Sequence, residues 1–143
     1  MDKSKVNFSK PMLIQSVAFK EVFLRMDGKG ISTACGAGAG KVNCQRSMAP
    51  TGAFKVQKQT DGTFTIESSK YPGVFLRMDG NGIHAFAGSG SGRVNCQFGA
   101  SAWERFKLHE QSDGSYTIES AAFPYVFLRM DGNNPSRKEE DFG

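Results

Sequence analysis

The segment GAGAGKVNC at residues 36–44 combines alternating glycines with a lysine, a composition found in loops that wrap phosphate groups. A phosphate-binding P-loop requires the pattern GxxxxGK[ST], but here Lys41 is followed by Val42. A second copy, GSGSGRVNC at 88–96, carries Arg93 in place of the lysine. Neither copy opens a helical pattern, so no helix N-terminus would face an anion. We therefore interpret both segments as hairpin loops and not as nucleotide sites.

Arginine and aspartate stand two residues apart at three places, and residues with this spacing on a strand share one face. The pairs are Arg25/Asp27, Arg77/Asp79 and Arg129/Asp131. Such a pair can form a cradle for sugar hydroxyls, in which aspartate accepts and arginine donates. We favour the alternative, in which the arginine and aspartate form an ion pair or the aspartate caps a turn. In a turn cap, the aspartate side chain forms a hydrogen bond with the backbone of the residues that follow it.

Side-chain amides next to the glycine-rich loops are further ligand candidates, because an amide donates and accepts at once. These amides would form hydrogen bonds either with hydroxyl groups of a ligand or with backbone groups of the buried loop. Trp103, the only tryptophan, would serve either as a stacking platform for a sugar ring or as part of the core. The candidate ligand-binding set is Asp27, Asn43, Gln45, Asp79, Asn95, Gln97 and Trp103.

Catalysis is not expected from this sequence. The three cysteines, Cys35, Cys44 and Cys96, are neither in a CxxC motif nor next to a histidine, which argues against a zinc site and against a Cys–His nucleophile. The two histidines, His84 and His109, align with Ser32 and Gln57 of the first repeat. Glu67 and Glu119 stand at equivalent positions of two predicted strands, and we interpret both as residues on the surface of a strand. We therefore predict a protein that is not an enzyme and holds no metal or cofactor.

An internal repeat is the main signal in the chain. The heptapeptide VFLRMDG occurs at 22–28, 74–80 and 126–132, so the offset is 52 residues both times. Residues 23–74 align with 75–126 without a gap, and 26 of the 52 positions are identical. The chain thus holds two complete units and the two ends of a third.

Each unit contains four short segments typical of strands. FTIES and FKVQK alternate apolar and polar residues, and an Asp-Gly turn joins the two. VFLRMD and VNCQ supply the other two strands, and no helix of useful length is visible. Four strands per unit, repeated about three times, predict an all-β fold with a closed or nearly closed core.

A unit of about 50 residues containing the segment IESSKYPGVFLRMDG resembles the β-trefoil. The pattern is similar to a strand–turn–strand segment of fascins and fibroblast growth factors. IESSKYPGVFLR also resembles a segment of the arabinose-binding modules attached to some arabinofuranosidases, although Met26, Met78 and Met130 stand where those modules carry a histidine. The resemblance implies a pseudo-threefold barrel whose third repeat is shared between the two termini. It would form one domain over residues 1–133, followed by a polar tail at 134–143.

The length, net charge and hydropathy of the chain are compatible with a binding module. The chain has 143 residues, a net charge of +4 and no clustered basic stripe, so we expect no nucleic-acid partner. It has no apolar run long enough for membrane insertion and no secretory signal, from which we expect a cytoplasmic protein.

We predict lectin-like recognition of a carbohydrate or glycoconjugate through repeated shallow sites. The alternative is a fascin-like actin-bundling or other protein–protein interaction module. A growth-factor-like ligand is a third possibility, which the absence of a basic cluster disfavours. The oligomeric state, including a domain-swapped dimer, stays open.

Overall fold

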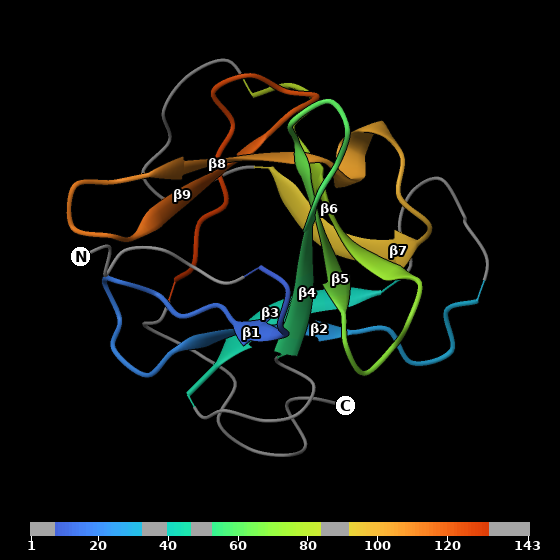
Figure 1. The fold of residues 1–143 in the computed structure, drawn as a ribbon. Coiled ribbons are helices and arrows are strands. Elements are labelled where there is room, and N and C mark those ends of the chain that lie inside the picture. Colours follow the sequence, from blue (N-terminus) through green and yellow to red (C-terminus); the bar gives the residue numbers. More distant parts are fainter. Residues whose placement is uncertain (1–7, 33–39, 47–52, 84–91, 132–143) are drawn as a thin grey trace.

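The computed structural model describes residues 8–32, 40–46, 53–83 and 92–131. Within these residues the protein is all-β, and its one helical element is the short 3-10 turn η2 (Ala102–Glu104) (Figure 1). The strands are β1 (Met12–Leu13), β2 (Phe23–Asp27), β3 (Lys41–Gln45), β4 (Ala53–Lys58), β5 (Phe64–Ser68), β6 (Val74–Asp79), β7 (Arg93–Phe98), β8 (Phe106–Glu110) and β9 (Tyr116–Ser120). The predicted all-β class is confirmed.

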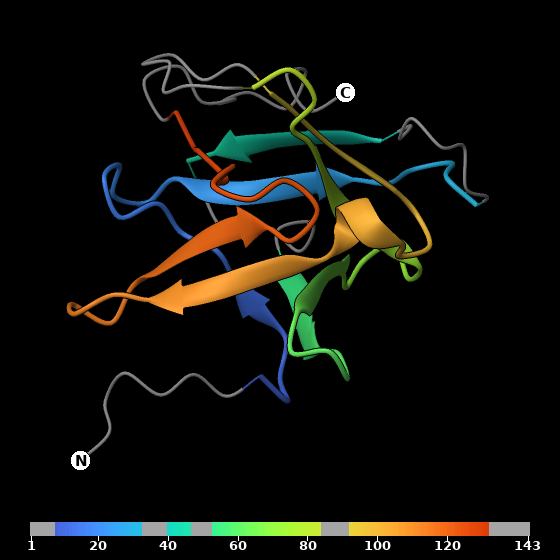
Figure 2. The same ribbon diagram turned by 90° about the horizontal axis from the view of Figure 1, so that it is seen from above.

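All strand pairs among the described residues are antiparallel and most join neighbours in the sequence. Three hairpins, β4–β5, β6–β7 and β8–β9, belong to one sheet, in which β5 also contacts β6 and β8, and β1 pairs with β4. The hairpin β2–β3 forms a separate two-stranded sheet. Viewed from above, the strands curl around a common interior instead of lying in a flat layer (Figure 2).

The turns between FKVQK-type and FTIES-type strands repeat the same hydrogen bonds. Asp61 Oδ1 accepts bonds from the backbone N (2.9 Å) and hydroxyl (2.6 Å) of Thr63. Asp113 makes the same two bonds to Ser115, at 2.9 and 2.6 Å. The glycine after each aspartate has a positive φ, 88° at Gly62 and 87° at Gly114, a conformation that only glycine adopts at little cost. The Asp-Gly hairpin prediction is therefore confirmed.

A second type of bend occurs three times, before each VFLRMD segment. The hydroxyls of Ser16, Ser68 and Ser120 accept a bond from the backbone N three residues later, at 3.0, 2.9 and 3.0 Å. The residue that ends each bend has a positive φ: 65° at Glu21, 87° at Gly73 and 71° at Tyr125. The three units therefore share one backbone path through this bend, although only one of them has glycine at its end.

The core contains the inward-facing residues of the repeated strands. Leu24, Met26, Leu76 and Met78 are at most 2 % exposed, and they pack with apolar residues of β4, β5, β7 and β8. The segments around the VFLRMD strands also approach one another closely at a glycine. A Cβ atom on Gly80 would lie 2.8 Å from the ring of Phe123 in the bend before the third VFLRMD segment, so this approach requires glycine.

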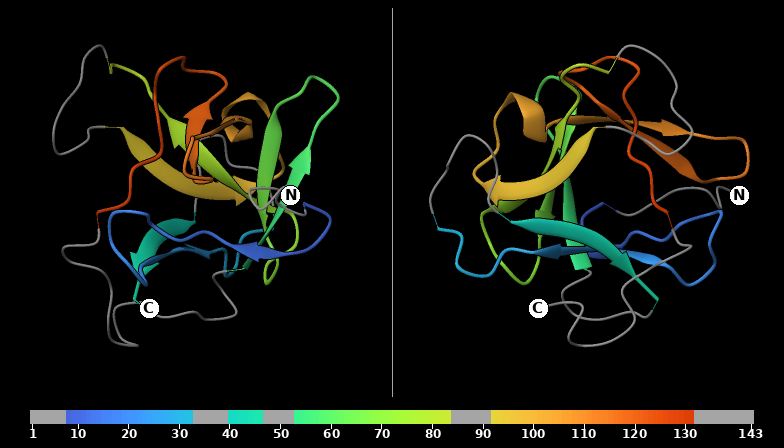
Figure 3. Two further views of the ribbon diagram at one scale, coloured as in Figure 1. Left: turned by 60° about the vertical axis from the view of Figure 1, so that its left-hand side comes forward. Right: turned by 180° about the vertical axis from the view of Figure 1, so that it is seen from behind.

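The third VFLRMD segment is less regular than the first two. Of residues 126–131, only Phe127 forms a bridge with a described residue, Glu119 on β9. In Figure 3 this segment runs down the side of the molecule toward β3. The predicted polar tail at 134–143 and most of the first glycine-rich loop lie outside the described residues.

Candidate functional site

The sequence-predicted residues of the first unit gather on one face of the hairpin β2–β3. The ladder places Arg25 opposite Asn43, Phe23 opposite Gln45 and Asp27 opposite Lys41. Because side chains alternate along a strand, these residues share the face turned away from Leu24 and Met26. The second unit repeats the register on β6–β7, where Arg77 faces Asn95 and Phe75 faces Gln97. The structure therefore brings the predicted residues together as two separate sets.

The aspartates at the ends of β2 and β6 cap the turns that follow them. Asp27 Oδ1 accepts a bond from the backbone N of Lys29 at 3.1 Å, and Asp79 Oδ1 accepts one from Asn81 at 3.0 Å. Asp27 Oδ2 also lies 3.8 Å from Nη2 of Arg25. Asp27 and Asp79 therefore act as turn caps, and Asp27 also forms an ion pair with Arg25, as the structural interpretation of the Arg–Asp pairs predicts. One oxygen of each carboxylate is thus engaged with the backbone.

In the second unit, the polar face surrounds a fully buried carboxylate, that of Glu104. Gln97 Nε2 donates to Glu104 Oε2 at 3.0 Å, and Nε of Arg77 lies 3.7 Å from the same oxygen. The other oxygen, Oε1, accepts bonds from the backbone N and hydroxyl of Ser101 at 2.8 and 3.0 Å. Arg77 also donates to Asn95 Oδ1 at 3.3 Å. A buried ion pair whose partners form further hydrogen bonds is the arrangement in which burial of charge is tolerated.

Trp103 covers this network. The guanidinium carbon of Arg77 lies 4.6 Å from the centroid of the Trp103 ring, within the range of a cation–π contact. The ring also meets Phe123 edge-on, with centroids 5.1 Å apart. Trp103 is half-buried and packs against its own protein, as expected for the core role weighed for it.

The first unit lacks the residues that complete this network. The gap-free repeat alignment places Thr51 at the position of Trp103 and Gly52 at the position of Glu104. Asn43 Oδ1 and Gln45 Nε2 are buried, and neither forms a hydrogen bond with any described residue. Gln45 is 2 % exposed, so its amide is removed from solvent as well. The two polar faces therefore share a framework and differ in whether other described residues bond their amides.

Glu104 is the residue that the sequence interpretation missed. A charged residue in the segment SAWERF reads as surface, and nothing local indicates that its side chain is 0 % exposed. The available signal was the repeat itself, because residues 98–105 and 46–53 share no identity within otherwise similar units. A segment that departs from its copy marks a position where the two units differ in structure.

A separate cavity of about 250 Å³ lies between β3, β7 and the third VFLRMD segment. Its apolar wall contains Val42, Val94, Leu128 and Met130 among others, and its polar side is formed by Asn43, Arg129 and Asp131 together with Cys44. Asn43 of the predicted set therefore borders both the polar face and this cavity.

The described cysteines, Cys44 and Cys96, are free thiols. Burial, and to a smaller extent the charge of Asp27, raises the pKa of Cys96 to about 12. Burial also raises the pKa of Cys44, with Asp131 as the smaller cause. Raised pKa values disfavour the reactive thiolate.

Metal-ligating side chains do not cluster in the part of the chain that the structure describes. No group of three histidine, cysteine or acidic side chains there is placed to hold a metal ion. Among the same residues, no helix has the length and hydrophobicity that crossing a membrane requires.

No protein-family model matches the chain, and no curated protein matches it in sequence. Its fold is similar to part of the solved structure of a mosquitocidal holotoxin, with a TM-score of 0.69 and 12% identity. The match covers 90% of this chain and 15% of the toxin chain. The chain thus has the fold of a short portion of that toxin.

Proposed function

We propose that the protein is a non-enzymatic, lectin-like module that binds a carbohydrate, built as a single β-trefoil over residues 1–133. The curled all-β architecture supports the trefoil. So does the repetition of the serine-capped bend in three units, at Ser16, Ser68 and Ser120. The fold shared with part of the toxin is consistent with this assignment.

The observation that carries the proposed function is the pair of unused amide atoms on β3. Asn43 Oδ1 accepts hydrogen bonds and Gln45 Nε2 donates them, and both lie on the face of the hairpin that also carries Asp27. A buried polar atom without a partner costs about 1–3 kcal/mol, so a ligand that satisfies both recovers this free energy on binding. A sugar hydroxyl is suited to the pair because it donates and accepts through one oxygen.

The first unit is therefore the primary site, and Asp27, Asn43 and Gln45 are its proposed contacts. The corresponding residues of the second unit, Asn95 and Gln97, already bond within the protein. Their role in ligand binding, with that of Asp79 and Trp103, stays a prediction. One such site gives weak affinity, and avidity would come from several modules acting together.

The test compares glycan binding of the wild type with that of Gln45→Met. Methionine keeps the length of the side chain and removes the amide donor, so sugar-competed binding should fall at least about tenfold, the loss expected for one or two hydrogen bonds. Gln57→Met on the exposed face of β4 is the matched control and should bind normally. Unchanged binding by Gln45→Met with an intact fold would remove Gln45 from the site, and silence of the wild type on a glycan array would refute the function.

The second candidate is a protein-interaction module, with fascin-like actin bundling as one form of it. The exposed side chains after the third bend favour this reading: Tyr125 is 86% and Phe127 44% exposed. Co-sedimentation with actin filaments tests the bundling form directly. Binding of filaments together with silence on glycans would replace the lectin proposal.

A further inference from the structure

The buried carboxylate of Glu104 occupies a defined position on the polar face of the second unit. Its Oε2 accepts a hydrogen bond from Gln97 Nε2 at 3.0 Å and lies 3.7 Å from Nε of Arg77. Glu104 belongs to η2, which packs against β6, so the carboxylate reaches this face from outside the hairpin β6–β7. The second unit thus brings a carboxylate of its own to a glutamine and an arginine of that hairpin.

The first unit repeats the glutamine and the arginine without the carboxylate. Gln45 and Arg25 stand in the register of Gln97 and Arg77, and all four residues are at most 6 % exposed. Gln97 donates through Nε2 to Glu104, whereas Gln45 Nε2 has no hydrogen-bond partner among the described residues. The donor that binds a carboxylate in the second unit is therefore present in the first and is not used by any described residue.

The chain around the first hairpin has no acidic residue to take the position of Glu104. The repeat alignment places Gly52 there, and residues 28–60 contain neither aspartate nor glutamate. This stretch includes 33–39 and 47–52, the two segments next to β3 that lie outside the described residues. Asp27 is engaged at the other end of the hairpin, where its Oδ1 caps the following turn and it stands opposite Lys41. The segments that adjoin β3 therefore do not supply an equivalent carboxylate.

The charges on the two hairpin faces differ in the same sense. The face of the second unit, with Glu104 included, has two cations and two carboxylates. The face of the first unit has the cations Arg25 and Lys41 and a single carboxylate, that of Asp27. The first face thus carries one more positive charge, and an anion is the ligand that complements it.

We propose that the first unit binds a carbohydrate that carries a carboxylate, such as a uronic acid or a sialic acid, and that this carboxylate takes the position of Glu104 in the second unit. Gln45 Nε2 donates to the carboxylate beside the guanidinium of Arg25, and Asn43 Oδ1 accepts from a hydroxyl of the same sugar. A hydrogen bond to an ionised acceptor is stronger than one to a hydroxyl, so the acid is preferred over a neutral sugar. This inference rests on the carbohydrate function proposed above and names the class of sugar.

The first test compares acidic sugars with their own methyl esters. Titrations of the full chain followed by nuclear magnetic resonance measure the affinity for the methyl glycosides of galacturonate, glucuronate and N-acetylneuraminate, and for the methyl ester of each. Esterification removes the charge and keeps the ring hydroxyls. At least one of the acids should bind at least about tenfold more tightly than its ester, as expected for the loss of a charge-assisted hydrogen bond.

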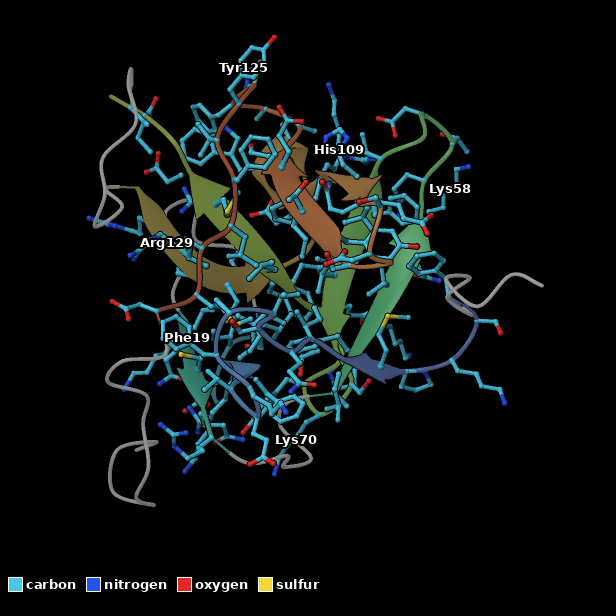
Figure 4. The ribbon with its side chains drawn as sticks, turned by 90° about the vertical axis from the view of Figure 1, so that its left-hand side faces the viewer. Phe19, Lys58, Lys70, His109, Tyr125 and Arg129 are labelled. Carbon is cyan, nitrogen blue, oxygen red and sulfur yellow. The ribbon has the colours of Figure 1, made fainter. Side chains whose placement is uncertain are left out.

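The variant Gln45→Glu tests whether the amide is the contact. Glutamate keeps the shape of the side chain and replaces the donor by a carboxylate that repels the carboxylate of the sugar. The ratio of acid to ester affinity should therefore fall to about one or below. Gln57→Glu, on the exposed face of β4, is the matched control and should keep the ratio of the wild type. Figure 4 shows the adjacent Lys58 projecting outward at the far end of β4 from the hairpin β2–β3.

The outcomes separate this inference from the proposed function. Equal binding of the acids and their esters to the wild type overturns the inference and leaves the carbohydrate function standing, as does binding of neutral glycans alone. Silence toward every glycan refutes both. A preference for the acid that survives in folded Gln45→Glu also overturns the inference.

The remaining acids of the chain are tested separately. The acidic residues outside the described ranges are Asp2, Glu139, Glu140 and Asp141. A variant with all four changed to the corresponding amides should bind the acidic sugars as the wild type does. Binding that appears only in this variant overturns the inference, because it assigns the position to a carboxylate of the chain itself.

Discussion

The carboxylate of Glu104 lies 3.7 Å from Nε of Arg77 in a site where Glu104 is 0 % and Arg77 3 % exposed. Removal of one charge from a buried pair leaves the other without compensation, which typically costs about 3–5 kcal/mol. We expect Glu104→Gln to lower the free energy of unfolding by about this amount, as measured by urea denaturation. The control is Arg105→Gln, which removes an exposed contact to Asp61 and should change little. A loss no larger than that of the control would contradict the role of Glu104 as the charge at the centre of the network.

Replacement of the two repeat-equivalent glutamines should have opposite effects. Gln97 donates to Glu104, whereas Gln45 Nε2 has no partner among the described residues. Gln97→Met should lower stability by about 1–3 kcal/mol, because it leaves the carboxylate with one donor fewer. Gln45→Met should be neutral or stabilising, because it removes a buried polar group that is not satisfied. Thermal unfolding of the two variants without ligand measures the difference, and an equal loss in both would show that Gln45 is satisfied.

Glu21 ends the first of the three bends in a left-handed backbone conformation with φ of 65°, where the second bend ends with Gly73. This conformation destabilises the folded state by about 1–2 kcal/mol for a residue with a side chain. Glycine removes this cost but also gives the unfolded chain more conformational freedom, which offsets part of the stabilisation. We therefore expect Glu21→Gly to raise the free energy of unfolding by up to about 1 kcal/mol. Lys20→Gly at the neighbouring position, which does not have a positive φ, should lower it. A destabilised Glu21→Gly variant would contradict the shared geometry of the three bends.

Glu119 should contribute stability that is lost in acid. Its carboxylate accepts bonds from the backbone N of Tyr125 at 2.6 Å and from the His109 ring at 2.7 Å, and these bonds hold its pKa below the ordinary value of 4.5. Because the folded-state pKa is lower than that of the unfolded chain, the stabilisation is complete above pH 4.5 and disappears as the pH falls through the folded pKa. The difference in unfolding free energy between the wild type and Glu119→Gln should therefore shrink below pH 4.5. A difference that stays constant in acid would contradict this assignment.

Cys96 should resist thiol reagents while the protein is folded. Its pKa of about 12 leaves almost no thiolate near pH 8, and its side chain is 0 % exposed. In a Cys35→Ser background, mass spectrometry after iodoacetamide treatment should find Cys44, which is half-buried, modified before Cys96. Both should react once the chain is unfolded in urea. Early modification of Cys96 would show that the core around it opens more readily than its burial indicates.

The sequence by itself determined the repeat, the strands and the turns. The strands and turns depend on local features, namely the alternation in FTIES and FKVQK and the Asp-Gly pairs. Local hydrogen bonds form these turns, such as the two that Thr63 donates to Asp61. The sequence also placed Asn43 and Gln45 on one face, because residues two apart on a strand always share a face.

Only the tertiary structure decided which of these polar residues are satisfied. Glu104 is distant in sequence from Arg77, and its burial depends on how η2 lies against β6. The attachment of residues 126–128 to β9 likewise depends on which strands lie side by side around the curled sheet. Such contacts join segments that are far apart along the chain, so neither hydrophobic periodicity nor turn composition records them.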